Sequence, residues 1–318
     1  MRQRRRIAII TPALASENNG NWQTAARWQH FLAPGHAVDC AKQWDEAPAD
    51  LMIALHARRS AASIAAFART GRPIALVLTG TDLYRDIRDD PVAQASLALA
   101  DRLVCLQEQG PMELEPALRA RARVIFQSAS RLAPRVPRQR HYELALVGHL
   151  RPEKDPMTAV HAFSLLDRPD WRLLQIGDAP LDALGDAVRA AAAQDPRIAM
   201  RGSLSHRATR DTIRRSRLLL LPSLMEGGAN ALIEAAMSDV PVLASRIAGS
   251  IGMLGEDYDG FFEVGNAAAL AGLIRRCRDD QGFLARLRSQ VRARSPRFET
   301  LHERDAVRAL AAELLGRD

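Results

Sequence analysis

Short runs of apolar residues alternate along the chain with longer stretches in which apolar residues recur at helical spacing. Apolar runs bounded by turn residues are typical of buried strands, and the periodic stretches are typical of amphipathic helices. We predict strands at 7–10, 37–40, 51–55, 74–78, 103–106 and 124–126 in the first half, and at 144–147, 171–176, 198–200, 218–221 and 240–244 in the second. Strands that alternate with helices in this way predict parallel sheets joined by crossover helices.

A segment of different composition separates the two halves. Residues 128–142 contain prolines, several arginines and few apolar side chains, which is typical of a linker. We therefore expect an N-terminal domain over 1–135, a C-terminal domain over 141–297 and a final amphipathic helix in 298–318 that packs back on the N-terminal domain. Each domain would be a Rossmann-like, doubly wound α/β domain, with ligands at the carboxyl ends of its strands. Two such domains would face each other across a cleft.

Almost all of the positively charged residues of the chain are arginines. Lysine and arginine number 44 against 37 acidic residues, and only Lys42 and Lys154 are lysines. A net charge of +7 invites a nucleic-acid-binding function. The arginines are spread out and interleaved with acidic residues, and no aromatic platform accompanies them, so small anionic molecules are the better-supported partners. A lysine that persists in so arginine-rich a chain is a candidate for a specific role.

The cysteines and the apolar runs bear on the compartment. Cys40, Cys105 and Cys277 are odd in number and far apart, which favours free thiols in a reducing cytoplasm. The apolar run at 7–10 is too short for a signal peptide. Because no apolar stretch reaches 18 residues, we expect no membrane span and no membrane partner.

Two glutamates, Glu226 and Glu234, lie eight residues apart across a glycine-rich loop and the start of a predicted helix. The loop and helix start consist of Gly227, Gly228, Ala229 and Asn230. Backbone N–H groups at such a helix start can bind a diphosphate. Glu226 could reach a sugar hydroxyl or a developing cation, and Glu234 could accept hydrogen bonds from a ribose diol.

This segment resembles the E-x7-E region of GT-B nucleotide-sugar glycosyltransferases of the family-4-like group, as does the segment 147–155 upstream. The resemblance implies that Lys154 binds the donor diphosphate and that Gly202 and Ser203 lie near the nucleotide base. That group usually has an arginine after the glycine of the first loop, whereas this chain has His149. We expect Arg151 to supply the charge instead. The resemblance implies neither a metal nor a further cofactor.

The first half narrows the resemblance. Segments 18–28, 54–61 and 78–86 are similar to the selenosugar synthases, the glycosyltransferases of selenoneine biosynthesis, and the likeness extends from about residue 7 to 315. It implies that UDP-N-acetylglucosamine or UDP-glucose is coupled to selenophosphate. A carbon–selenium bond forms, and UDP and phosphate are released. The small-molecule substrates would be the main partners, together with other enzymes of the pathway.

An anionic acceptor requires positive charge and N–H donors at the carboxyl edge of the first sheet. The expected acceptor-binding residues are Asn19, Gly20, Asn21, His56, Arg58, Arg59, Thr81 and Asp82. The expected catalytic residues are Glu226, Lys154, Arg151 and His56, of which Lys154 and Arg151 would stabilise the departing UDP. Three alternatives stay open: Arg58 and Arg59 as surface charges, Asp82 as a helix cap, and His56 as a satisfied core histidine.

Other functions stay open beside this one. The same fold could transfer a sugar to an ordinary hydroxyl acceptor or epimerise a nucleotide sugar, and a nucleic-acid-binding protein would rest on charge alone. Asp257-Tyr258-Asp259 matches a metal-binding signature of another glycosyltransferase fold, but its glycine-flanked position favours a turn. The other six histidines, at 30, 36, 141, 161, 206 and 302, have no metal-ligand spacing.

Overall fold

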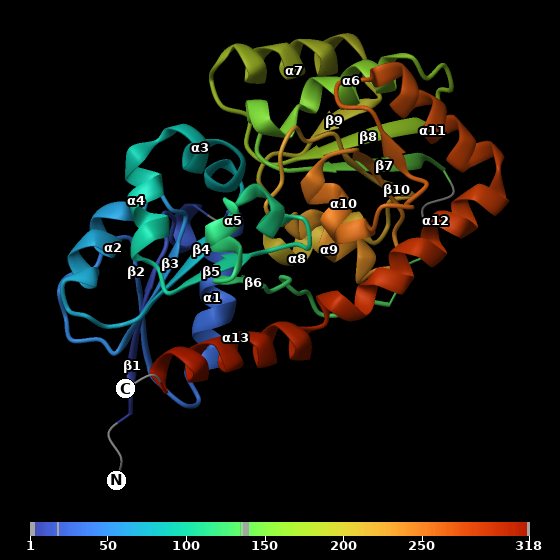
Figure 1. Cartoon of the computed structure of the whole chain (residues 1–318). Coiled ribbons are helices and arrows are strands. Elements are labelled where there is room, and N and C mark those ends of the chain that lie inside the picture. The colour runs from blue at the N-terminus through green and yellow to red at the C-terminus, as the bar shows by residue number, and fades with distance from the viewer. Residues whose placement is uncertain (1–3, 18, 134, 136–139, 317–318) are drawn as a thin grey trace. The chain divides into compact units, whose positions relative to one another are not determined.

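The structure, a computed structural model, describes residues 4–17, 19–133, 135 and 140–316 (Figure 1). Asn18 of the predicted acceptor segment, and Pro134 and Pro137 of the predicted linker, lie outside these residues. The chain folds into two compact units. Unit 1 comprises Met1–Gln127, Glu226–Gly228 and Thr300–Asp318, and unit 2 comprises Ser128–Met225 and Ala229–Glu299.

Unit 1 is built on a six-stranded parallel sheet in the order β2-β1-β3-β4-β5-β6. Its strands are β1 (Arg6–Ile10), β2 (Ala37–Ala41), β3 (Leu51–Leu55), β4 (Ile74–Leu78), β5 (Arg102–Cys105) and β6 (Ala122–Val124). Its helices are α1 (Gly20–Leu32), α2 (Ala61–Ala68), α3 (Ile87–Asp89), α4 (Pro91–Leu99), α5 (Pro116–Arg119) and α13 (Thr300–Leu315). A π-helical turn, Asp82–Asp86, precedes α3.

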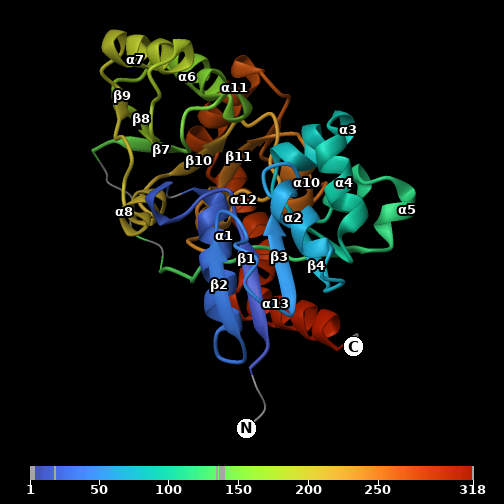
Figure 2. The same cartoon turned by 90° about the vertical axis from the view of Figure 1, so that its left-hand side faces the viewer.

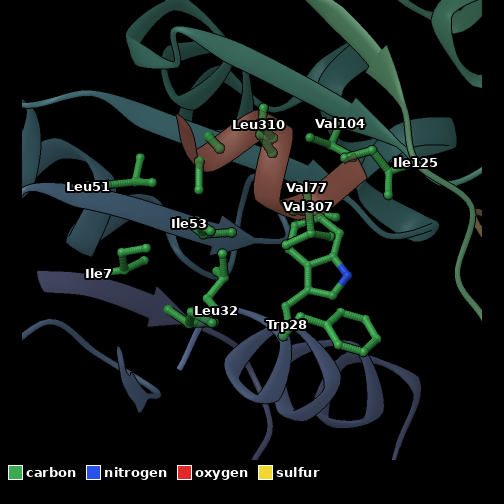
Figure 3. Close-up of a cluster of buried hydrophobic side chains, with 14 of the residues drawn as sticks. Ile7, Trp28, Leu32, Leu51, Ile53, Val77, Val104, Ile125, Val307 and Leu310 are labelled. Atoms are coloured by element: carbon green, nitrogen blue, oxygen red, sulfur yellow. The ribbon is translucent and has the colours of Figure 1, made fainter. Parts of the chain in front are cut away.

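Two layers of helices cover this sheet. Helices α1 and α13 bury Trp28, Leu32, Val307 and Leu310 against one face (Figure 3), and α2 and α4 bury Ile64, Phe67 and Leu97 against the other. Figures 1 and 2 show α13 beside α1, although the two are far apart in the sequence. Burial of a leucine or phenylalanine side chain contributes about 1.5–3 kcal/mol, so each layer is held mainly by the hydrophobic effect.

A buried carboxylate fixes α13 in unit 1. Glu303 is 1% exposed, accepts a hydrogen bond from the indole of Trp28 at 2.8 Å and pairs with Arg27 Nε at 3.0 Å. Near the end of the same helix, Glu313 pairs with Arg102. Because a buried charge is costly unless it is paired, these bonds select one position of the helix.

Unit 2 contains a second six-stranded parallel sheet in the order β12-β11-β10-β7-β8-β9. Its strands are β7 (Tyr142–Val147), β8 (Trp171–Ile176), β9 (Ile198–Met200), β10 (Leu218–Leu221), β11 (Val242–Ser245) and β12 (Phe261–Phe262). Its helices are α6 (Pro156–Ser164), α7 (Ala183–Gln194), α8 (His206–Ile213), α9 (Asn230–Ala236), α10 (Ala248–Leu254), α11 (Ala267–Asp279) and α12 (Gln281–Arg294). The predicted fold class, two doubly wound α/β units, is confirmed.

Some element boundaries differ from those that the sequence predicts. The strand predicted at 124–126 begins earlier, as β6, and the strand predicted at 240–244 is β11, shifted towards the C-terminus. No predicted element corresponds to β12 or to α10, α11 and α12. The structure divides the units at Gln127, before the segment read as a linker, and groups Glu226–Gly228 with unit 1. No helix within the described residues has the length and apolar character needed to cross a membrane.

Candidate active site

The order of strands in unit 2 marks one place for a ligand. From β7 the chain continues to β8 on one side, and it later returns to β10 on the other, so the order reverses between β7 and β10. Doubly wound sheets bind ligands in the crevice outside the carboxyl ends of such neighbouring strands. Arg151 and Lys154 follow β7, and Ala229 and Asn230 follow β10. Four of the predicted donor residues of unit 2 therefore flank this reversal.

The loop after β7 is locked to the loop after β8. Gly177 has a φ of 137°, and a Cβ atom there would lie 2.1 Å from the carbonyl oxygen of Gly148. Both the backbone conformation and the close approach of the two loops therefore require a glycine at this position. His149 Nδ1 accepts a hydrogen bond of 3.1 Å from the backbone N–H of Asp178. The histidine that replaces the family's usual arginine thus has a structural contact, joining β7 to β8.

Lys154 ends the short 3-10 helix Pro152–Lys154, directly before α6. Its side-chain carbons lie along Gly148, 3.9 Å from where a Cβ atom of that glycine would be. Asp155 follows in a left-handed conformation, with a φ of 42°, and caps α6 by accepting from the N–H of Thr158. Arg151 is half-exposed. Both cations therefore come from one short, capped turn at the carboxyl edge of β7.

A hydrogen bond joins this turn to the segment after β10. The backbone N–H of Leu224 donates to the carbonyl oxygen of Glu153 at 2.9 Å. Ser245, at the end of β11, donates to the carbonyl oxygen of Ser223 in the same segment. The residues that precede Glu226 are thus fixed beside the residues that precede Lys154, although 70 positions separate Leu224 from Lys154 in the chain.

Several positions of the glycine-rich loop make packing contacts within their own unit. The N–H of Ala229 donates to Met253 Sδ at 3.4 Å, and Asn230 is the first residue of α9, which has seven residues. Within unit 1, a Cβ atom at Gly227 would lie 2.4 Å from the carbonyl oxygen of Thr79, and one at Gly228 would lie 2.5 Å from the side-chain oxygen of Gln127. Close packing therefore already requires both glycines.

Both glutamates of the motif are buried. Glu226 is 4% exposed and belongs to unit 1, and Glu234, in α9 of unit 2, is 7% exposed. Glu234 Oε1 lies 2.7 Å from Nε2 of His206, the first residue of α8. His206 has no metal-ligand spacing in the sequence and was given no role there. No sequence signal could have found this partner, because His206 lies 28 positions before Glu234 and belongs to a different helix–strand repeat.

Gly202 and Ser203 follow β9, at the edge of the sheet of unit 2. Gly202 has a φ of 64°, and its carbonyl oxygen accepts a hydrogen bond of 2.9 Å from the N–H of Gly177. Both residues are exposed. Hydrogen bonds therefore link the loop after β7 to the loop after β8, and that loop to the loop after β9, along one edge of the sheet. Gly202 and Ser203 lie at the outer end of this edge.

In unit 1 the strand order reverses between β1 and β3. Asn19, Gly20 and Asn21 follow β1 and start α1. The side-chain oxygen of Asn19 accepts from the N–H groups of Asn21 and Trp22, at 3.1 and 3.2 Å. Asn19 is thus a helix cap, and its side chain already engages one of the N–H groups expected for the acceptor.

His56 follows β3 and is 3% exposed, with a φ of 75° that few residues other than glycine adopt. Its Nδ1 accepts the N–H of Arg59 at 3.3 Å, so the proton of the neutral ring is on Nε2, 3.2 Å from the hydroxyl oxygen of Thr81. Burial lowers the pKa of His56, while the charges of Asp82 and Asp86 oppose that shift. His56 is therefore neutral at pH 7.

Asp82 is fully buried, and its carboxylate accepts from the N–H groups of Ala57, Thr79 and Gly80 at 2.9–3.0 Å. It ties the loop after β3 to the loop after β4 and does not cap a helix, because Thr81 is the cap residue of the turn Asp82–Asp86 and the three donors all precede Asp82 in the chain. Asp86, which was not among the predicted site residues, is buried, and its Oδ2 lies 3.9 Å from His56 Nε2. Its only sequence signal was its position four residues after Asp82.

The two arginines after β3 lie at the surface. Arg58 Nε pairs with Asp90 at 2.9 Å, and the side chain of Arg58 is 57% exposed. Arg59 is also exposed, and its backbone N–H is bound to His56. Arg58 therefore has the ion pair expected of a surface charge at a helix start, whereas the structure assigns the Arg59 side chain no such partner among the described residues.

The acidic and thiol residues of the described chain do not form a metal cluster. Within the described ranges no group of three or more His, Cys, Asp or Glu side chains could hold a metal ion. Tyr258 is buried, and its hydroxyl donates to the carbonyl of Val242, while Asp259 pairs with Arg286 at 2.7 Å. The Asp-Tyr-Asp segment is thus an anchored turn.

Burial raises the pKa of the Cys105 and Cys277 thiols to about 12.

Comparison with known proteins identifies a family match and several structures of similar fold. Residues 134–294, half of the chain, match the family described as glycosyl transferases group 1. HepE from Anabaena, solved with UDP and glucose, is 15% identical, with 97% of this chain and 100% of HepE covered and a TM-score of 0.76. Sucrose-phosphate synthase from Thermosynechococcus elongatus is 16% identical, with 99% and 100% covered and a TM-score of 0.81.

A glycosyltransferase from Rickettsia africae is 15% identical, with 99% of this chain and 100% of that chain covered and a TM-score of 0.73. No curated protein sequence matches significantly. At these identities the solved structures show the fold alone, and that fold is GT-B, as the sequence predicts. The family match adds the activity. The chain belongs to the glycosyl transferases group 1 and is a glycosyltransferase of GT-B fold.

Proposed function

We propose that this glycosyltransferase couples a sugar from UDP-N-acetylglucosamine or UDP-glucose to selenophosphate. The selenium atom attacks C1 of the sugar, so a carbon–selenium bond forms while the bond from C1 to the diphosphate oxygen breaks and UDP leaves. Water then cleaves the selenium–phosphorus bond, which releases phosphate and leaves the selenosugar. The family match supports glycosyl transfer, and the likeness of segments 18–28, 54–61 and 78–86 to selenosugar synthases supports this acceptor.

The observation that best supports the proposed UDP-sugar donor site is the hydrogen bond between Leu224 and Glu153 at the strand reversal of unit 2. It fixes the turn that bears Arg151 and Lys154 beside the segment that leads to Glu226. Two cations at that edge can stabilise the charge that develops on UDP as it leaves. HepE, a structural relative, was solved with UDP-glucose, which supports a uridine diphosphate donor for this chain as well.

Glu234 is the residue we propose for the ribose diol, and Glu226 for the transferred sugar. A carboxylate has two oxygens and about four lone pairs, so Glu234 can bind His206 and still accept from a ligand hydroxyl. Gly202 and Ser203, at the outer end of the same edge, are proposed for the nucleotide base. Gly227, Gly228, Ala229 and Asn230 remain proposed donor residues, although packing already accounts for the two glycines.

For the acceptor we propose the carboxyl edge of unit 1. His56 is neutral and has its proton on Nε2, 3.2 Å from the Thr81 hydroxyl, so an anionic acceptor would take the place of Thr81 as the partner of that proton. Arg59 and Arg58 would add positive charge. Gly20 and Asn21 would contribute backbone N–H groups at the start of α1, where the N–H of Asn21 would exchange Asn19 Oδ1 for the acceptor. Thr81, Asp82 and Asn19 would act mainly by fixing the loops, since their side chains bond to protein groups.

Selenophosphate is already a strong nucleophile, so the mechanism asks less of a general base than transfer to a hydroxyl does. Catalysis then rests on holding the two substrates in line and on stabilising the leaving diphosphate. We propose that the reaction needs no metal or other cofactor, and that the enzyme works in the cytoplasm, where its three free cysteines stay reduced. Activity unchanged by a chelator is the expected result.

The test is UDP release by the full chain, measured with UDP-N-acetylglucosamine and UDP-glucose in separate reactions. Selenophosphate should raise UDP release well above the rate in water alone, and inorganic phosphate at the same concentration should not. A panel of sugars and glycerol represents the alternative, a conventional hydroxyl acceptor. Release stimulated by one of these and not by selenophosphate would replace the proposed function with that alternative.

A further inference from the structure

His206 and Glu234 form a contact between two helices of unit 2 that no sequence motif joins. His206 is the first residue of α8, and the hydroxyl of Ser205 caps that helix by accepting from the N–H of Ala208. The side chain of His206 is half-exposed, whereas Glu234 on α9 is buried. The distance of 2.7 Å from Nε2 to Oε1 is that of a strong hydrogen bond.

The chemistry of the pair fixes which atom donates. An ionised carboxylate can only accept, so Nε2 of His206 must carry a proton whether the ring is neutral or charged. Arg210 lies one helical turn further along α8 and is buried, and its charge acts on Glu234 from the same face. Its guanidinium donates to the carbonyl oxygen of Ser130, which holds it in place.

A carboxylate that recognises a diol must present its oxygens at one angle. Glutamate has three rotatable bonds, and fixing such a side chain on ligand binding costs affinity. His206 removes part of that cost, because its hydrogen bond to Oε1 sets the plane of the carboxylate before a ligand arrives. Arg210 does not do the same, because its guanidinium is bound to the backbone carbonyl of Ser130.

We propose that His206 is a positioning residue for the nucleoside of the donor: its Nε2–H orients Glu234 so that the carboxylate accepts from the vicinal hydroxyls of the ribose. His206 does not itself contact the reacting atoms. The proposal rests on the proposed function, in which Glu234 binds the ribose of a uridine diphosphate. It adds a second residue, from another helix, on which recognition of the ribose depends.

The experiment measures the dissociation constants of UDP and 2′-deoxy-UDP for the full chain by calorimetry. The wild-type chain should prefer UDP, because only UDP offers the complete diol. His206→Ala should weaken UDP binding about fivefold, the loss expected for one hydrogen bond, and leave 2′-deoxy-UDP nearly unaffected. His206→Gln should restore most of the preference, because the glutamine amide can also donate to Oε1. His161→Ala, an exposed histidine on α6, is the matched control.

The double variant His206→Ala, Glu234→Ala tests whether His206 affects UDP binding only through Glu234. If His206 acts only through Glu234, adding His206→Ala to Glu234→Ala should change UDP binding by less than about twofold. A preference for UDP that is unchanged in His206→Ala would overturn the positioning role and leave the proposed function standing. Absence of UDP binding by the wild-type chain would overturn the proposed donor site itself, and the role of His206 with it.

Discussion

Units 1 and 2 each have loops at the carboxyl edge of a parallel sheet whose strand order reverses once, but they use polar side chains differently. In unit 1, Asp82 and Glu303 are buried and bound to several donors of the protein itself. In unit 2, Arg151 and Lys154 lie on a short surface turn that backbone bonds and a helix cap hold in place. The family match also covers unit 2 and not the first 133 residues.

The difference teaches which residues to regard as ligand-binding. A carboxylate whose oxygens accept several backbone N–H groups has little capacity left, and removing it would leave those donors unsatisfied. A lysine or arginine on a fixed turn carries a positive charge that a phosphate can bind. We therefore expect substitutions of buried acids in unit 1 to affect stability first, and substitutions of the cations in unit 2 to affect catalysis first.

The largest expected effect is on stability, for Glu303→Ala in unit 1. Loss of this buried carboxylate leaves Arg27 and the indole of Trp28 without their partner and should destabilise the protein by about 3 kcal/mol. Thermal unfolding measures the change. Asp305→Ala, on the exposed side of the same helix, is the control and should unfold nearly as the wild type does. Equal unfolding temperatures for the two variants would contradict a buried anchor.

Lys154→Ala should have the largest effect on catalysis. If Lys154 stabilises the departing diphosphate, kcat should fall about a hundredfold while the unfolding temperature stays the same. Lys42, the other lysine, is exposed and paired with Glu17 in unit 1, so Lys42→Ala is the matched control and should retain full activity. A Lys154→Ala variant as active as Lys42→Ala would remove the donor role from this turn.

Glu234→Ala should act on binding more than on chemistry. Loss of the proposed ribose contact should raise the KM for the UDP-sugar about tenfold and leave kcat within about threefold. Steady-state rates at varied donor concentration measure both constants. If kcat fell and KM did not change, Glu234 would act in the transition state, and the assignment of the ribose to α9 would be wrong.

The smallest effect concerns the pH dependence of stability. Burial lowers the pKa of His56 below its usual 6.5, so the unfolded chain binds a proton there more readily than the folded one. This residue therefore contributes stability that is present above pH 6.5 and is lost as the pH falls towards its lowered value. Unfolding temperatures of the wild type and His56→Asn, compared at pH 7.5 and 5.5, measure it. Asparagine tolerates the positive φ.

The His56→Asn variant should lose less stability on acidification than the wild type. An identical loss in both proteins would mean that other groups account for the whole pH dependence. Because His56 is also a proposed acceptor residue, the comparison uses unfolding alone and no activity measurement. It thus tests the burial of His56 in unit 1 independently of the proposed reaction.

Much of the fold could be predicted because several strands are uninterrupted apolar runs. The bounds predicted for β3, β8 and β10 agree with the structure, since each is bounded by polar or turn residues and buried on both faces. β12 has only two residues, too few for a periodic signal. The order of strands in each sheet does not follow from the pattern, and it is this order that brings the loops after β7 and β10 together.

The site was predictable at the level of motifs and not at the level of contacts. The spacing of Glu226 and Glu234 and the rarity of lysine pointed to the residues now proposed for the donor. His206 could not be found because its contact with Glu234 depends on how α8 packs against α9. For Asp82, one residue type suits both a substrate contact and a loop anchor, and only the structure shows its three backbone donors.

The measurement that tests the central claim most directly is the mass spectrum of the product formed from UDP-N-acetylglucosamine with selenophosphate. We predict a new sugar species that shows the isotope envelope of selenium, appears together with UDP and phosphate, and is absent with Lys154→Ala. UDP formation with no selenium-containing sugar, or a sugar bonded to an oxygen acceptor instead, would contradict carbon–selenium bond formation by this enzyme.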